Sequence, residues 1–145
     1  MIAYTVRRLE RTEWPLAFRV IHELRNHLSE TDYLDRLGRM CERFEYELIA
    51  AFDSSGQIVG AMGMRPLETL ARGWHMHIDD LVTSQSVQRR NVGTALLQYA
   101  EEVARNRGMS GLFLDSRPTA QGFYEKRGFV LHPPLVMKKT IQDRI

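Results

Sequence analysis

The 145-residue sequence predicts an α/β fold whose sheet is mixed and mainly antiparallel. Two apolar, strand-like segments flank residues 53–56, Asp-Ser-Ser-Gly, a composition typical of a β-hairpin turn. A helical pattern over residues 92–106 lies between strand-like residues 74–83 and 112–114. Because a strand–helix–strand unit places its two strands in the same direction, we expect one parallel pair beside the antiparallel hairpins.

The first part of the chain should contribute one strand and two helices. Residues 3–9 alternate well enough for a strand, and Thr12 is the candidate N-cap of a helix that tolerates Pro15 in its first turn. A second helix is expected over residues 31–44. The residues that should face the core are Leu16, Val20, Leu24 and Leu28 in the first helix and Tyr33, Leu34, Leu37 and Met40 in the second.

The middle of the chain should form most of the sheet. The hairpin strands are expected at residues 46–52 and 58–64, and a loop at residues 66–73 should follow them. The strand at residues 74–83 should then lead into the helix, with Gly108 in the left-handed position after its last turn.

The last part should complete one domain over residues 1–145. It should hold the strand at 112–114, a short helix at 119–126 that is stopped by Gly128, and one or two closing strands from Phe129 onward. No repeat or low-complexity linker interrupts the sequence, and its length and 43% hydrophobic content suit a single two-layer core.

A polar loop precedes the helix at residues 92–106. It contains Gln88, Arg89, Arg90, Asn91 and Gly93. Asn and Gly tolerate positive φ most readily, so the chain can turn sharply and direct several backbone N–H groups at one point. The helix start adds its own N–H groups and the positive end of its dipole. The loop therefore favours a phosphate or pyrophosphate site, and the alternative is an ordinary turn with two solvated arginines.

Two motifs in this order carry a resemblance to a known family. The first is Gln-x-x-Asn-x-Gly-Thr-Ala at residues 88–95, and the second is Ala-x-x-Phe-Tyr-x-x-x-Gly-Phe at residues 120–129. With these motifs the chain resembles, from Ala3 to about Val136, the GNAT superfamily of acetyl-coenzyme A-dependent N-acetyltransferases. Neither a P-loop nor a Gly-x-Gly-x-x-Gly motif after a strand is present.

The resemblance implies a GNAT-type sheet, flanked by helices, in which the two parallel strands splay apart to admit the pantetheine arm of acetyl-coenzyme A. The backbone of Leu81, Val82 and Thr83 should pair with that arm like an added strand. The pyrophosphate should lie against Gln88, Arg89, Arg90, Asn91, Val92, Gly93 and Thr94. The family prefers glycine at the position of Asn91, but Asn can adopt the left-handed conformation and the loop should survive. Many members carry a cofactor-contacting asparagine where this chain has Arg117, so that contact is left open.

Acetylation of an amine requires a proton acceptor, because an amine with a pKa near ~10 is mostly protonated at neutral pH. Regular alternation puts five residues of one strand on the same face: His75, His77, Asp79, Leu81 and Thr83. Asp80 would lie on the opposite face in a structural role. His77 is the better base, because histidine titrates near neutral pH, whereas Asp79 either orients His77, acts through a water molecule or attracts a cationic amine. The alternative is that these residues form only the polar face of a half-buried strand.

Tyr124 matches the tyrosine with which GNAT enzymes protonate, or hydrogen-bond, the sulfur of coenzyme A. The alternative is a core aromatic residue beside Phe123. Asp115 and Ser116 should border the same cleft, and Asp115 either recognises the substrate or caps the following turn. The first two helices and the loop at 66–73 should form the acceptor side.

The composition limits compartment and partners. A single cysteine, Cys41, excludes an intrachain disulfide, and the N-terminus does not read as a signal peptide, so a cytoplasmic protein is expected. No apolar run reaches the roughly 18 residues that a membrane span needs. A net charge of +2, without aromatic residues among the loop arginines, gives no indication of nucleic-acid binding. No metal is expected, and a homodimer is left open.

The predicted function is transfer of an acetyl group from acetyl-coenzyme A to a primary amine of a small molecule or peptide, directly within a ternary complex. The alternative is a non-catalytic, acyl-coenzyme A-binding regulatory domain. The presence of both His77 and Tyr124 argues against that alternative.

Overall fold

The computed structural model of the protein describes residues 3–87, 91–132 and 134–142. The chain divides into two compact units, Met1–Asp115 and Ser116–Ile145, called here the first and second units. The first unit contains the whole sheet and most of the helices. The expectation of one domain over residues 1–145 stays a prediction.

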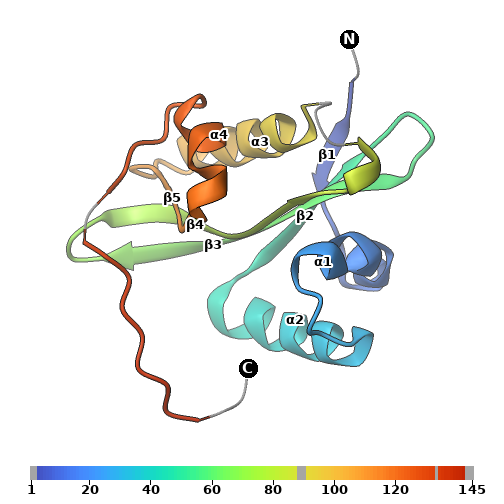
Figure 1. The fold of residues 1–145 in the computed structure, drawn as a ribbon, viewed down its shortest axis with the longest axis horizontal. Coiled ribbons are helices and arrows are strands. Elements are labelled where there is room, and N and C mark those ends of the chain that lie inside the picture. Colours follow the sequence, from blue (N-terminus) through green and yellow to red (C-terminus); the bar gives the residue numbers. More distant parts are fainter. Residues whose placement is uncertain (1–2, 88–90, 133, 143–145) are drawn as a thin grey trace. The chain divides into compact units, whose positions relative to one another are not determined.

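The first unit is built on one five-stranded sheet with the strand order β1-β2-β3-β4-β5 (Figure 1). The strands are β1 Thr5–Arg8, β2 Glu47–Phe52, β3 Ile58–Thr69, β4 Gly73–Thr83 and β5 Leu112–Leu114. Strands β1 to β4 pair antiparallel in succession, and β4 pairs parallel with β5. The prediction of a mixed, mainly antiparallel sheet is confirmed.

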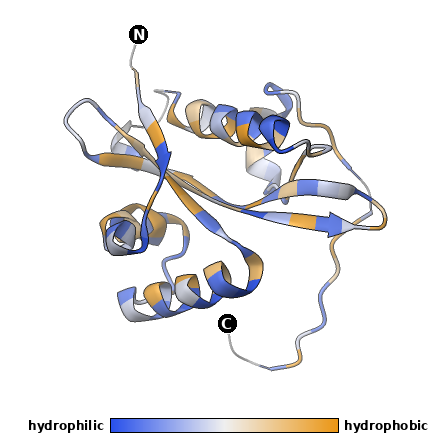
Figure 2. Ribbon diagram, turned by 180° about the vertical axis from the view of Figure 1, so that it is seen from behind, coloured by the Kyte–Doolittle hydropathy of each residue, from blue (hydrophilic) through white to orange (hydrophobic). Residues whose placement is uncertain are grey.

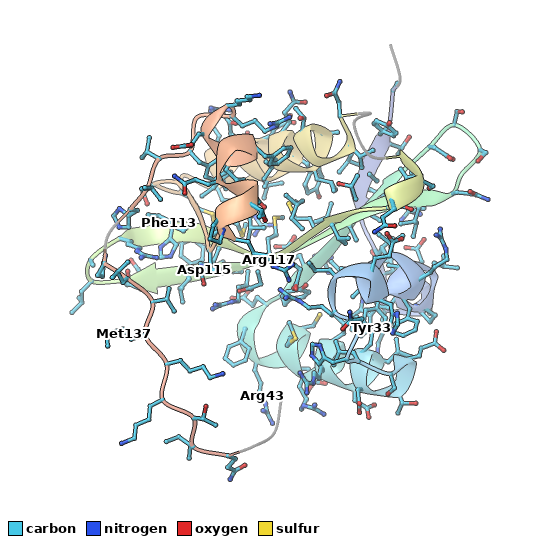
Figure 3. The ribbon with its side chains drawn as sticks, viewed as in Figure 1. Tyr33, Arg43, Phe113, Asp115, Arg117 and Met137 are labelled. Atoms are coloured by element: carbon cyan, nitrogen blue, oxygen red, sulfur yellow. The ribbon has the colours of Figure 1, made fainter. Side chains whose placement is uncertain are left out.

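Helices cover both faces of this sheet, with α1 and α2 on one face and α3 on the other (Figure 1). The elements are η1 Arg11–Ala17, α1 Phe18–Leu24, α2 Glu30–Phe44, η2 Gln85–Val87 and α3 Val92–Asn106. Figure 2 shows hydrophobic residues along the central strands and a mixture of hydrophobic and hydrophilic residues along the helices. On the α1–α2 face, Tyr33 (Figure 3) is buried against Phe18 and donates a hydrogen bond to the Trp14 carbonyl at 2.6 Å.

The start of the first helical segment differs from the prediction. It begins as a 3-10 helix, in which the Glu10 N–H donates to Glu13 Oε1 at 2.9 Å, and Thr12 lies inside it rather than at the cap. Because a 3-10 helix has three residues per turn, Trp14 and Ala17 share its buried face, and Leu16 is 62% exposed. Leu16 therefore does not face the core. The expected stripe of a regular α-helix was therefore wrong at that residue.

Strand β3 is longer than expected and includes the first half of the predicted loop at residues 66–73. Pro66 pairs with Met76 of β4, and only Leu70 to Arg72 connect the two strands. Strand β2 pairs with β3 no further than Met64. Beyond Met64, β3 is an edge strand on that side, so the missing N–H of a proline costs no ladder bond.

The helix α3 has the expected bounds, and Gly108 follows it with φ +71°. In the second unit, η3 Pro118–Ala120 and α4 Gln121–Glu125 form the predicted short helix, and Gly128 follows with φ +90°. The expected closing strands are not formed in residues 129–132 and 134–142. An isolated strand satisfies none of its backbone groups without a neighbour, so apolar composition alone does not make one. Within the described ranges, no helix has the length and apolar character needed to cross a membrane.

Candidate active site

A β-bulge in β4 shapes the centre of the first unit. The antiparallel register pairs Gly63 with Asp80 and Met64 with Ile78, which leaves Asp79 as an extra residue without a partner in β3. A bulge of this kind interrupts the alternation of side chains along a strand. His77, Asp79 and Asp80 therefore point to one side of the sheet, and the acidic pair Asp79–Asp80 is brought together.

Because of the bulge, the residues of β4 that follow Asp79 face the opposite side of the sheet from the one expected. A side chain at Gly60 would meet Val92 and Leu96 of α3, and Thr83, the pairing partner of Gly60, therefore lies on the α3 face. Val82 instead packs against the core cluster under α1 and α2. Leu81 and Thr83 thus lie on the face opposite His77 and Asp79, and the prediction that they share one face was wrong. The expected face of Asp80 was also wrong, because Asp80 lies on the same side as Asp79.

A cavity of about 500 Å³ opens beside the bulge on the α1–α2 face. Its walls come from α2, β3 and β4, from the residue that follows α1 and from the residue that precedes β2. The lining residues are Arg25, Met40, Phe44, Tyr46, Arg65, Asp79 and Asp80. The lining combines two carboxylates and two guanidinium groups with an apolar rim, which suits a small polar ligand that also has an uncharged part.

Asp80 is held from two sides at the floor of this cavity. Arg25 Nε donates to Asp80 Oδ1 at 2.8 Å, and its Nη2 donates to the Asp79 carbonyl at 3.1 Å. The hydroxyl of Tyr46 donates to Asp80 Oδ2 at 2.7 Å. Burial, followed by the nearby charge of Asp80, raises the pKa of Tyr46 well above its ordinary value, so the phenol stays protonated as a donor. These contacts fix the bulge to the residue that follows α1 and to the residue that precedes β2.

Replacement of Gly63 by alanine is expected to lower the free energy of unfolding by about 2–6 kcal/mol, because overpacking and the loss of a buried hydrogen bond each cost about 1–3 kcal/mol. A Cβ at Gly63 would overlap the hydroxyl and ring of Tyr46. Denaturant unfolding measures the change. Gly111→Ala is the control, since its Cβ would come no closer than 3.9 Å to Phe113. Equal losses in the two variants would contradict the role assigned to Gly63.

Asp79 is bonded on both carboxylate oxygens. Arg65 Nε donates to Oδ2 at 2.7 Å, and His77 Nδ1 lies 3.1 Å from Oδ1. Burial raises the pKa of Asp79, but the hydrogen bonds from His77 and Arg65 and the charge of Arg65 outweigh it and leave the pKa below its ordinary value of 3.8. Asp79 is therefore a carboxylate at neutral pH, and a carboxylate only accepts hydrogen bonds.

This hydrogen bond decides the tautomer of His77. Since the Asp79 carboxylate cannot donate, Nδ1 of His77 carries the proton, and Nε2 of the neutral ring has the lone pair. The His77 side chain is 14% exposed and contacts the cavity through Asp79 rather than lining it. His75, two residues earlier, is fully buried against Phe113 of β5 (Figure 3), with Nδ1 2.8 Å from the Gly73 carbonyl. His77 and Asp79 thus form a hydrogen-bonded pair, as their spacing predicted.

Among the residues that the structure describes, one edge of β4 has no strand partner over the second half of the strand. The parallel ladder with β5 consists of three pairs and ends at Ile78–Leu114, whereas β4 continues to Thr83. The backbone groups of Leu81, Val82 and Thr83 that face away from β3 are therefore beyond the β5 ladder. A cofactor arm could pair with them as an added strand does.

The start of α3 has the geometry expected of an anion site. Asn91 adopts the left-handed conformation, with φ +64° and ψ +22°, and the first intrahelical bond runs from Ala95 N to the Asn91 carbonyl at 3.1 Å. The N–H groups of Val92 and Gly93 precede this bond, and such groups point out of the helix at its positive end. Val92 and Gly93 are buried and Thr94 is half-buried. The predicted residues Gln88, Arg89 and Arg90 lie outside the described residues.

Tyr124 lies in α4, in the second unit. Its ring packs edge-on against Phe123 and Phe129, with centroid distances of 5.1 and 5.6 Å. Burial raises the pKa of Tyr124, so the phenol is protonated at neutral pH. Asp115, Ser116 and Arg117 are exposed.

Sequence reasoning missed several residues of the cavity. Arg25, Met40 and Phe44 belonged to the helices of the expected acceptor side, but Tyr46, Arg65 and Asp80 had no role assigned in the site. One signal pointed toward Asp80, namely the pair of adjacent aspartates in the middle of an expected strand.

The chain is similar to known acetyltransferases in sequence and in fold. The model of the acetyltransferase (GNAT) family matches residues 4–129. An uncharacterized N-acetyltransferase of Bacillus subtilis (strain 168), YhdJ, is 32% identical over 130 residues, which cover 87% of this chain and 91% of that protein. Glucosamine 6-phosphate N-acetyltransferase of Trypanosoma brucei brucei is 34% identical over 80 residues, 54% of each chain.

Solved structures share the fold. An acetyltransferase of Trypanosoma brucei is 25% identical, has a TM-score of 0.79, and the match covers 95% of this chain and 100% of the other. Glucosamine-6-phosphate N-acetyltransferase from Arabidopsis thaliana is 17% identical, with a TM-score of 0.78 over 97% and 99% of the two chains. Because the family model spans most of the sequence and the Bacillus subtilis relative matches along nearly its whole length, the chain belongs to the GNAT family of acetyltransferases.

Proposed function

We propose that this acetyltransferase uses acetyl-coenzyme A to acetylate a primary amine of a small molecule, by direct transfer within a ternary complex in the cytoplasm. The observation that carries the proposal is the His77–Asp79 pair beside a charged cavity, on the strand whose far half has an open edge. Strand β4 therefore carries a proton acceptor, lies beside a cavity that suits an amine, and has an open edge that suits a cofactor arm.

The described residues fit the cofactor. The open edge of β4 at Leu81, Val82 and Thr83 suits the amide-containing pantetheine arm, and the N–H groups of Val92 and Gly93 suit its pyrophosphate. Bound acetyl-coenzyme A supplies an acetyl group activated as a thioester.

His77 is the proposed base and Asp79 its positioning residue. The low pKa of Asp79 makes it a poor proton acceptor, whereas its charge fixes the ring and stabilises His77 once the ring has taken a proton. Tyr124, with its raised pKa, is the proposed donor of the proton that the departing sulfur needs.

Direct transfer is favoured over an acyl-enzyme by the environment of Cys41. Its Sγ donates to the Tyr46 carbonyl at 3.1 Å, and burial raises its pKa, so the nucleophilic thiolate is disfavoured. Cys41 does not line the cavity.

Release of coenzyme A thiol in the presence of acetyl-coenzyme A and a panel of amines tests the function. The panel should include amino sugars, because one relative is a glucosamine 6-phosphate N-acetyltransferase. Amine-dependent thiol release, with acetylated product found by mass spectrometry, is the expected result. Tight binding of acetyl-coenzyme A without release for any amine would favour a regulatory domain instead.

Replacement of Gly93 by valine is expected to raise the dissociation constant of acetyl-coenzyme A at least about tenfold, because a side chain would occupy the place of the phosphate. Calorimetry measures the constant. Gly93→Ala should give a smaller increase and guards against misfolding of the valine variant. Gln98→Val, an exposed position on the same helix, is the control and should bind like the wild type. Wild-type affinity in a folded Gly93→Val protein would contradict this site.

A further inference from the structure

We propose that the acceptor is a small zwitterion, an amine that also carries an oxyanion, and that Arg65 binds this carboxylate or phosphate. The inference rests on the proposed function and specifies its substrate class. The basis of the inference is the set of hydrogen-bonding groups in the cavity that have partners in the structure and the set that do not.

Arg65 keeps most of its donors for a ligand. A guanidinium has five N–H groups, and Arg65 uses the one on Nε for Asp79 at 2.7 Å. Its Nη1 and Nη2 have no acceptor among the described residues, while the side chain lines the cavity and is 30% exposed. The bond at Nε fixes the plane of the guanidinium, so the Nη edge is held ready for an oxyanion.

Arg25 adds to this positive edge. It uses Nε for Asp80 and Nη2 for the Asp79 carbonyl, and Nη1 has no acceptor in the described part of the chain. Two arginines therefore face one small cavity. Each is bonded to an aspartate, and each has N–H groups without an acceptor among the described residues.

The two carboxylates, by contrast, already have a partner on each oxygen. Asp79 accepts from Arg65 on one oxygen and bonds His77 on the other, and Asp80 accepts from Arg25 and Tyr46. Because each carboxylate is paired with an arginine, its negative charge is compensated and attracts a purely cationic polyamine weakly. The N–H groups of the two arginines that have no acceptor in the described part of the chain favour a ligand with an anionic group.

The distance between the two recognition elements indicates a small molecule. Arg65 Nε and His77 Nδ1 bond the two oxygens of the same carboxylate, so the Nη groups of Arg65 and the Nε2 of His77 are separated by one aspartate side chain and the widths of the guanidinium and the imidazole ring. An amino acid or an amino sugar phosphate can reach both. Met40 and Phe44 complete the cavity with apolar surface for the uncharged part of such a molecule.

The test compares acceptors that are matched except for the anion, with kcat/KM expressed per concentration of unprotonated amine, because loss of the anion also lowers the pKa of the amine. The pairs are glucosamine 6-phosphate with glucosamine, and phenylalanine with phenylalaninamide, each assayed by thiol release for kcat and KM. We expect the wild type to prefer the anionic member of one pair by about tenfold to hundredfold in kcat/KM, the range for a charge-assisted bond. Arg65→Gln should abolish that preference, mainly through the KM of the anionic member, and Arg65→Lys should restore part of it.

A disturbance of Asp79 by the substitution would lower kcat/KM for the neutral members of the pairs as well. The ratio of kcat/KM within a pair therefore measures the contribution of the anion. Arg39→Gln, an exposed arginine of α2 outside the cavity, should keep the wild-type ratio. Preference within one pair assigns the phosphate or the carboxylate. Turnover without preference for either anion, or preference that survives Arg65→Gln, overturns the inference and leaves the proposed function standing. Absence of thiol release with any amine overturns both.

Discussion

Replacement of His77 by alanine is expected to lower kcat/KM about 10²–10⁴-fold near neutral pH, the usual contribution of a positioned general base. The wild-type value should rise with pH when it is measured from about pH 5 to 8, because only the neutral ring accepts a proton from the amine. The variant should lack this rise and follow the ionisation of the amine alone. A series of kcat/KM values across this pH range, with acetyl-coenzyme A saturating, measures the effect.

Two further variants distinguish a role of His77 as general base from a purely structural role. Asp79→Asn removes the charge that stabilises the protonated ring, so the rising limb should move to lower pH without disappearing. His27→Ala, an exposed histidine outside the cavity, should reproduce the wild-type profile. A His77→Ala profile superimposable on that of the wild type would instead assign the proton to a chain of water molecules.

The elements that could be predicted best are those whose signals are local. Helix α3 has the expected bounds because its apolar period is regular and Gly108 ends it. The left-handed Asn91 was foreseen because few other residues adopt that conformation without strain. The pairing of His77 with Asp79 followed from a spacing of two residues in a strand, which survives up to the bulge.

The part of the site that could not be predicted depends on the register between strands. Regular alternation assigned Asp80 to the wrong face because a single extra residue inverts every position beyond it. The bulge is stabilised by Tyr46, which can lie over Gly63 because that residue has no side chain. No local pattern around Asp80 contains this long-range contact.

Arg65 was missed for the same reason. Its register partner is His77, so its guanidinium reaches Asp79 diagonally across the sheet. The sequence shows only an arginine before a proline, which reads as the beginning of a loop. The closing strands were expected from β-forming residues such as Val130 and Val136, which are exposed in the described tail. Composition indicates that a segment can pair and does not supply the neighbouring strand.

Replacement of Tyr124 by phenylalanine should lower kcat about 10²–10⁴-fold and change the affinity for acetyl-coenzyme A by no more than about threefold, since a proton donor acts in the transition state. The substitution preserves the ring that packs against Phe123 and Phe129 and removes the hydroxyl alone. Burial raises the pKa of this phenol, so the wild type holds the proton at the pH of the assay. Turnover under chemistry-limited conditions and calorimetric binding separate the two quantities.

Tyr99→Phe is the matched control for Tyr124. It makes the same substitution at a half-buried tyrosine of α3 whose pKa is also raised by burial. If loss of a buried hydroxyl acted through stability, both variants would lose activity in proportion to their fall in melting temperature. A proton donor predicts a different pattern, in which Tyr124→Phe melts like the wild type and turns over slowly. Wild-type turnover of Tyr124→Phe would show that the ring contributes packing only, and that the departing sulfur takes its proton from another group.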